Sequence, residues 1–171
     1  MLTKGVVSEI YNEELENVKS LFPINKWFHQ PASLIEFTNS KSVLGLAYPC
    51  GKVEVNERFL GTATESLLRN TIRHELSHLV VGTHHCHNKH FKAVATYLDV
   101  RPNSDFPELD CIIDKISFKY MVYAHLTDGT TVKIGGVHRK TKKYTNYNDQ
   151  EIKNMSVKSI PVNTFEFREN Y

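Results

Sequence analysis

Six of the nine histidines in the chain lie between residues 69 and 92, in the stretch RNTIRHELSHLVVGTHHCHNKHFK. His74 and His78 are four residues apart, and Glu75 directly follows the first of them. Because four residues make about one helical turn, both imidazoles can reach one ion, and neutral imidazole nitrogen is a good Zn²⁺ ligand. Glu75 then lies beside the ion, where its carboxylate can accept a proton from water. This HExxH pattern predicts a zinc site suited to hydrolysis.

A catalytic zinc ion takes three protein ligands and keeps one position open. Candidates for the third ligand lie downstream: His84, His85, His87, His90 and, as a softer ligand, Cys86. The metzincin pattern HExxHxxGxxH would select His84, but Val81 stands where that pattern requires glycine. A distant glutamate, as in thermolysin-like enzymes, is a further option. The spacing therefore leaves the third ligand open.

The HExxH residues lie in a segment, residues 64–81, whose apolar positions have helical spacing. These positions are Leu68, Ile72, Leu76, Leu79 and Val80. At about 100° per residue, their stripe centres opposite His74 and His78, with Glu75 between the two faces. The competing interpretation is a solvated helix with surface histidines. A ligand face opposite the core face favours the metal site instead.

Other segments indicate the elements that must position this helix. Residues 8–21 have helical spacing and end before Pro23, and residues 89–98 form a further amphipathic helix with Asn88 as its cap. Between them, SLIEFTNS, SVLGLAYP and GKVEVN are short β-branched segments separated by turn residues, which predicts a small antiparallel sheet. The aromatic residues Trp27, Phe28 and Phe37 are expected in the core.

The composition changes near residue 111, so we expect a domain over 1–110 and a β-rich, basic subdomain over 111–171. Three segments of the tail read as strands, KISFKYMVYAHLTDGTTVKIGG, KKYTNYN and VKSIPVNTFEFRE, and Asp128-Gly129 predicts a hairpin. Residues 1–110 carry 11 basic and 13 acidic side chains, whereas residues 111–171 carry 10 and 6. The positive charge is therefore concentrated in the tail.

A basic segment, HRKTKKY, lies within this tail. Its cations adjoin a tyrosine, a combination suited to phosphates and base stacking in single-stranded DNA. The candidate nucleic-acid-binding residues are Arg139, Lys140, Lys142, Lys143 and Tyr144. A solvated basic hairpin is the equally weighted alternative.

The overall composition, 171 residues with 40% hydrophobic and 23% charged, is that of an ordinary soluble globular protein. No run approaches the roughly 20 apolar residues that cross a bilayer, and the amino terminus lacks a secretory signal. Cys50, Cys86 and Cys111 are widely spaced without a CxxC pair, which argues against a disulfide framework or a cysteine zinc finger. We therefore expect a cytoplasmic protein with no membrane partner.

Three segments together resemble the SprT-like metalloprotease domain of bacterial SprT and eukaryotic Spartan: IEFTNSKSVLGLAYPCGKVEVNERFL, LLRNTIRHELSHLVVG and HNKHFKAVATYLDV. The resemblance covers residues 33 to 100 and implies an α+β, zincin-like fold. It also implies His87 as the third zinc ligand, because His87 and Phe91 keep the family's four-residue interval, although Asn88 replaces its glycine. The implied substrates are proteins on, or crosslinked to, DNA.

The tail segment GGVHRKTKKYTNYN resembles the middle of the small zinc ribbon that many relatives append. Both cysteine pairs of such a ribbon are missing here. If the tail descends from a ribbon, its strands must be held by apolar packing of Ile116, Phe118, Val122, Val132 and Ile134.

Two functions remain in view at this point. One is a zinc-dependent protease with a single Zn²⁺, in which Glu75 accepts the proton of water and returns it to the leaving amine. The other is a noncatalytic module stapled by zinc, whose basic tail binds nucleic acid or a protein. A general-base glutamate favours the protease, because a structural zinc site is usually closed by four ligands.

Overall fold

The computed structural model describes residues 1–115, 118–147 and 155–169. The chain divides into two compact units, Met1–Lys115 and Ile116–Tyr171. Unit 1 contains the HExxH motif and unit 2 the basic segment. No helix within the described ranges has the length and apolar character needed to cross a membrane.

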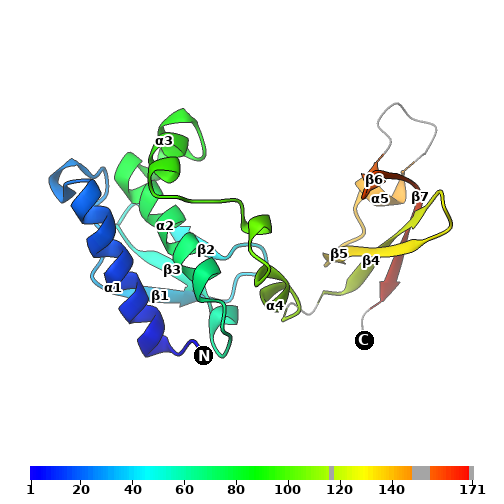
Figure 1. The fold of residues 1–171 in the computed structure, drawn as a ribbon, viewed down its shortest axis with the longest axis horizontal. Coiled ribbons are helices and arrows are strands. Elements are labelled where there is room, and N and C mark those ends of the chain that lie inside the picture. The colour runs from blue at the N-terminus through cyan, green and yellow to red at the C-terminus, as the bar shows by residue number, and fades with distance from the viewer. Residues whose placement is uncertain (116–117, 148–154, 170–171) are drawn as a thin grey trace. The chain divides into compact units, whose positions relative to one another are not determined.

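Four α-helices, one small sheet and short 3-10 turns make up unit 1. The helices are α1 (Lys4–Leu21), α2 (Glu65–Val81), α3 (Lys89–Tyr97) and the short α4 (Leu109–Ile113). The strands are β1 (Ile35–Thr38), β2 (Gly45–Ala47) and β3 (Val53–Asn56). Helix α2 lies between α1 and α3, and it also packs against β2 and β3 (Figure 1). The HExxH helix is thus the centre of the unit.

The strand order is β1-β3-β2, with β2 antiparallel and β1 parallel to β3. The prediction of an all-antiparallel sheet was therefore wrong for β1. β1 is parallel to β3 because the connection after β1 passes β3 and enters β2 at the edge of the sheet. The chain then returns as β3, which lies between β1 and β2. Asn56 fixes this connection, because its buried side-chain amide donates hydrogen bonds to the carbonyl oxygens of Ser40 and Val43 at 2.7 and 2.8 Å.

The predicted helices of unit 1 are confirmed, with small differences in their ends. Thr3 caps α1 through a side-chain oxygen that accepts from the Val6 amide. Asn88 caps α3 as expected, since its side-chain oxygen accepts from the His90 and Phe91 amides. The core stripe of α2 is inaccessible to solvent at Leu68, Ile72, Leu76 and Leu79. These side chains anchor the helix and leave its other face to the histidines.

Two of the three aromatic residues expected in the core are there. Trp27 is buried and donates its indole N–H to the Phe22 carbonyl oxygen at 2.8 Å, while Phe37 packs against the core at its margin. The prediction was wrong for Phe28, whose side chain is 61% exposed. Its backbone N–H donates to the Val80 carbonyl oxygen, so the segment is held against the end of α2 while the ring faces outward beside His84.

A buried carboxylate joins α1 to α2. Glu14 is only 3% exposed, and it accepts hydrogen bonds from Arg73 at 2.8 Å and from Arg69 at 3.0 Å. Burial raises the pKa of Glu14, but the hydrogen bonds and positive charges of the two arginines outweigh this effect, so that the pKa lies below its ordinary 4.5. Arg73 directly precedes the first ligand candidate, so this ion pair also fixes the start of the motif.

Replacing Glu14 by glutamine is expected to lower the free energy of unfolding by roughly 2–3 kcal/mol at neutral pH, because two arginines lose a buried partner. Since the folded-state pKa is lowered, the contribution is complete above 4.5 and is lost as the pH falls through the folded-state value. Urea unfolding at several pH values measures the difference from wild type. Glu16→Gln, which removes an exposed pair with Lys19, is the control; a difference unchanged in acid would contradict the assignment.

Unit 2 is an antiparallel sheet in the order β5-β4-β7-β6. Its strands are β4 (Tyr120–Leu126), β5 (Thr131–Val137), β6 (Ser156–Val157) and β7 (Ile160–Glu169). The hairpin predicted at Asp128-Gly129 is confirmed. The strand predicted over KKYTNYN was wrong for its described residues, because Lys142–Thr145 form one helical turn, α5, and Asn146 and Tyr147 are not in a strand. This turn places the Tyr144 ring against Phe165, with ring centroids 4.8 Å apart.

Apolar packing holds this sheet on one face. Its buried centre is Ala124, Leu126 and Val162, and Val132 and Ile134 pack against it as expected. Val122 is also buried, and Phe118 fills the space above Gly136, where an added Cβ would lie 2.1 Å from its ring. Ile116, the remaining residue of that prediction, lies outside the described residues.

Candidate metal centre

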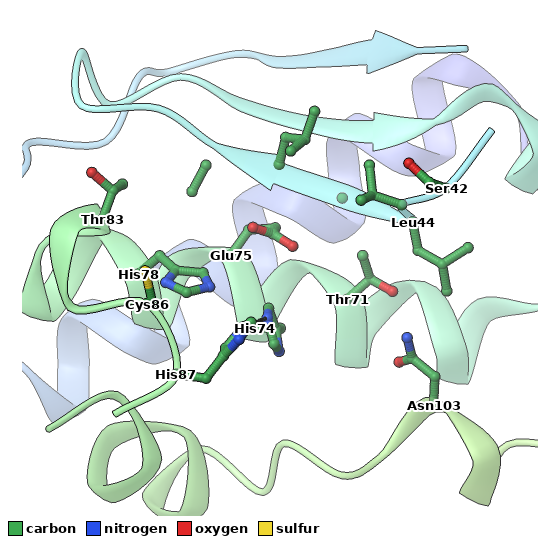
Figure 2. A pocket seen from close by; sticks show the side chains of 14 residues that line it. Ser42, Leu44, Thr71, His74, Glu75, His78, Thr83, Cys86, His87 and Asn103 are labelled. Atoms are coloured by element: carbon green, nitrogen blue, oxygen red, sulfur yellow. Dashed lines mark hydrogen bonds between the residues drawn. The ribbon is translucent and has the colours of Figure 1, made fainter. Parts of the chain in front are cut away.

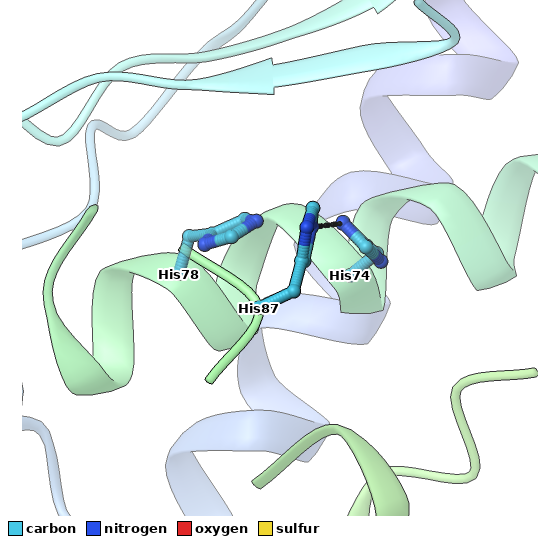
Figure 3. Close-up of side chains that lie close together, drawn as sticks. All are labelled: His74, His78 and His87. Atoms are coloured by element: carbon cyan, nitrogen blue, oxygen red, sulfur yellow. Dashed lines mark hydrogen bonds between the residues drawn. The ribbon is translucent and has the colours of Figure 1, made fainter. Parts of the chain in front are cut away.

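The structure brings together His74, His78 and His87. The first two project from the same face of α2, and the third comes from the connection between α2 and α3 (Figure 3). The three ring centroids form a nearly equilateral triangle with sides of 5.0–5.1 Å. One ligand atom of each ring lies within 4.8 Å of the others, and Nε2 of His74 is 3.0 Å from Nε2 of His87.

This geometry fits a zinc ion. Tetrahedral bonds of about 2.0–2.1 Å place neighbouring ligand atoms roughly 3.3 Å apart, which small ring rotations reach from the observed positions. Figure 3 shows one ring nitrogen of His78 turned toward His87, while its Nδ1 atom is buried without a hydrogen-bond partner within the described ranges. Three neutral nitrogen donors and an open fourth direction are the donor set of a catalytic zinc site.

Burial keeps the imidazoles of His74 and His78 neutral. Burial lowers the pKa of His74 to about 4, helped by the charge of His87, and it lowers the pKa of His78 to about 4, helped by both other rings. Both side chains are therefore unprotonated at neutral pH, as metal binding requires.

Phe91 supports all three rings from one side. Its ring is stacked on His78 at 4.3 Å between centroids, and it meets His74 and His87 at 4.9 and 4.8 Å. Phe91 is itself buried, so the three imidazoles share an apolar contact that is shielded from solvent. The four-residue interval from His87 is therefore explained by packing, because it places this ring one turn into α3.

The other histidines of the motif region form a separate group. The rings of His84 and His85 are 4.2 Å apart, and those of His85 and His90 are 5.0 Å apart. Among the residues that the structure describes, only the triad has three or more ligand atoms within 4.8 Å. Cys86 lines the same pocket as the triad without joining this group.

Glu75 lies between α2 and strand β2, beside the histidines (Figure 2). Its side chain is buried, and this raises its pKa to about 8, although a hydrogen bond from the backbone of Ala47 acts in the opposite direction. A nearby cation favours the ionised form of such a carboxylate. The carboxyl group thus lies in the pocket that the three imidazoles also line.

A pocket of about 510 Å³ opens over these residues. One wall is the segment 42–47, which contains β2, and Thr71, Thr83 and Asn103 complete the lining with the residues of the motif. Figure 2 shows Leu44, Thr71 and Asn103 on one side of the histidines and Thr83 on the other. The residue types of this wall did not predict a substrate pocket, because backbone and small side chains form much of it.

The basic residues of the tail lie in unit 2. Arg139, Lys140, Lys142 and Lys143 are exposed, whereas Tyr144 is half-buried against Phe165 and Phe167. Lys140 lies over the rings of Tyr120 and Phe167, and Lys143 lies over Tyr144. The segment therefore presents cations above aromatic rings. The Tyr144 ring itself packs against other aromatic rings of unit 2.

Comparisons with known proteins add one finding. The model of the SprT-like family matches residues 15–107, which include α2, the sheet, the triad and the pocket wall. Comparisons with curated proteins and with solved structures each gave no match. The matched range extends beyond the residues 33–100 that carried the resemblance and spans more than half of the 171-residue chain. With this match, the chain belongs to the SprT-like family.

Proposed function

We propose that the protein is a zinc-dependent peptidase. Members of the SprT-like family are typically zinc metalloproteases. The observation that carries the proposal is the convergence of three imidazoles within 4.8 Å beside a buried glutamate, in a pocket open to a substrate. His74, His78 and His87 hold the ion in this proposal, and Glu75 is the general base.

Zinc, when bound, polarises a peptide carbonyl, makes water more acidic and, through its charge, lowers the pKa of the adjacent carboxyl. The Glu75 carboxylate accepts a proton from water and returns it to the nitrogen of the leaving peptide. Burial between α2 and β2 holds this carboxylate in one place and excludes bulk solvent from it.

Strand β2 supplies a binding edge for the substrate. The Leu44 carbonyl oxygen accepts from the backbone N–H of Asn56, and the backbone N–H of Tyr48 donates to the Lys52 carbonyl oxygen. The backbone groups of Leu44 and Tyr48 therefore face β3. Since backbone groups alternate along a strand, the N–H and C=O groups of Gly45 and the C=O group of Ala47 face the open edge, while the Ala47 N–H donates to Glu75. An extended peptide can add to such an edge and pass over the histidines. The substrate is therefore an extended protein segment.

Removal of the metal is the test of this function. Purified wild type should contain about one zinc ion per chain. It should cleave an unfolded protein, lose this activity with a chelator and regain it with added zinc. Elemental analysis and gel electrophoresis measure the two quantities. Zinc-loaded protein that cleaves no protein substrate, with or without DNA, would overturn the proposal in favour of a noncatalytic zinc module.

The proposal extends to substrates located on single-stranded DNA. Its support is the exposed group of four cations at residues 139–143 and the basic excess of residues 111–171. Flexible cations of this kind bind phosphates without sequence preference. Lys140 lies over the Phe167 ring and Lys143 over the Tyr144 ring, and these two rings contact each other.

Alanine at Lys140, Lys142 and Lys143 together should weaken binding of a single-stranded oligonucleotide. If each lysine contacts one phosphate, the slope of log affinity against log salt should fall by about 2. Fluorescence anisotropy at several salt concentrations measures both effects. A control variant carries alanine at three exposed lysines of unit 1: Lys26, Lys41 and Lys92. Equal losses in both variants, or binding that is insensitive to salt, would exclude the basic segment as the DNA site.

A further inference from the structure

Gly45 is buried at the start of β2, directly against the HExxH helix. A Cβ atom at this position would lie 2.8 Å from Cγ of Glu75, 2.8 Å from Oε1 of Glu75 and 2.8 Å from Cγ2 of Thr71. Carbon atoms in contact prefer a separation of about 3.5–4.0 Å. No side chain fits here unless one of its neighbours moves.

The backbone conformation does not explain this glycine. Glycines with positive φ in the described part of the chain include Gly51 and Gly82, but Gly45 is not one of them. An alanine can adopt the extended backbone of β2 without strain. The requirement at residue 45 is therefore one of space above α2.

The three close atoms belong to two side chains, and of these the Glu75 side chain is the easier to displace. Strand β2 is fixed by its pairing with β3, and Thr71 is buried with its hydroxyl bonded to the Leu67 carbonyl oxygen at 2.8 Å. The carboxyl group is the end of a flexible side chain, held by the backbone hydrogen bond from Ala47. Crowding from residue 45 would push it out of its place beside the histidines.

We propose that Gly45 is a positioning residue for the general base: its missing side chain makes the space in which the Glu75 carboxylate lies. This inference rests on the proposed peptidase function and assigns a further residue to the same site. Gly45 acts only through Glu75 and does not bind the ion.

Gly45→Ala is the test, with Gly5→Ala as the matched control. At Gly5 a Cβ atom would meet only Oγ1 of Thr3, at an ordinary 3.8 Å. Gly45→Ala should lower kcat by about 100-fold, the effect of misplacing a catalytic group by about 1 Å. Zinc content and KM should remain those of wild type, because the histidines and the substrate edge are intact. A rise in KM with unchanged kcat, or a loss of zinc, would overturn the assignment.

A crystal structure of Gly45→Ala provides a readout that does not depend on activity. The Glu75 carboxylate should be displaced while His74, His78 and His87 keep their wild-type positions. An unmoved carboxylate would overturn the positioning role, even if the variant is slow. If wild type proves inactive, the peptidase proposal fails by that result, and the crystal structure still decides whether Gly45 places the carboxylate.

Thr71→Ser distinguishes the contact with Thr71 from the contact with Glu75, because it removes Cγ2 and keeps the hydroxyl that bonds to Leu67. Of the three atoms nearest to the added Cβ, the two that remain in Gly45→Ala/Thr71→Ser belong to Glu75, so kcat should stay low. Full recovery in the double variant would show that Thr71, and not Glu75, is the crowded residue. If Gly45→Ala alone does not fold, the double variant serves for the same kinetic and crystallographic measurements.

Discussion

Glu75→Gln is expected to lower kcat for peptide hydrolysis by about 10²–10⁴-fold, the contribution of a positioned general base. The amide has nearly the same shape as the carboxyl group and can still accept the backbone hydrogen bond from Ala47, but it cannot take a proton from water. Because the three histidines are untouched, zinc should remain at about one ion per chain. Steady-state kinetics and elemental analysis on the same preparation measure the two quantities.

The control for this variant is Glu65→Gln on the same helix. The Glu65 side chain is exposed and pairs with Arg69 four residues later, away from the pocket lining. It should leave kcat unchanged. Retention of activity in Glu75→Gln would contradict the general-base role, whereas loss of both activity and zinc would show that the residue instead maintains the metal site.

His87→Ala is expected to have the largest effect on zinc binding that a residue outside α2 can produce. It removes one of three ligands, so zinc affinity should fall by more than about 100-fold. A loss of about 100-fold is already the upper end for mutations of residues that only contact the ligands. Cleavage should be lost at zinc concentrations that saturate wild type. Competition with a chromophoric chelator measures the affinity directly.

His90→Ala is the matched control, since His90 lies three residues away but outside the triad. It should keep the affinity of wild type. If His87→Ala retained zinc and the control lost it, the third ligand would have to be sought among the ring group of His84, His85 and His90. Full zinc in both variants would move the search to Cys86 or to a carboxylate.

The HExxH helix could be predicted because its information is local. A stripe of leucine and isoleucine opposite two histidines defines a core face and a ligand face, and both are found in α2. The third ligand was not decided by spacing, since five side chains between residues 84 and 90 were candidates. The family resemblance selected His87, and the packing of Phe91 against all three rings gives a physical reason for this choice.

Other features depend on contacts that a sequence pattern does not contain. The parallel pairing of β1 follows from a connection held by Asn56, and short strands between turn residues look the same in either direction. Phe28 has the hydrophobicity of a core residue, but the backbone bond to Val80 turns its ring outward. The role of Gly45 is a contact between a strand and a helix about 30 residues apart, so only the assembled fold reveals it.

The division of the triad between a helix and a connecting segment has a consequence for metal exchange. Two ligands are preformed on α2, whereas His87 depends on the conformation of residues 82–88. In the proposed site, two imidazoles of one helix and one imidazole of this segment would hold the ion. Its release would then depend on the local stability of residues 82–88 as well as on that of α2.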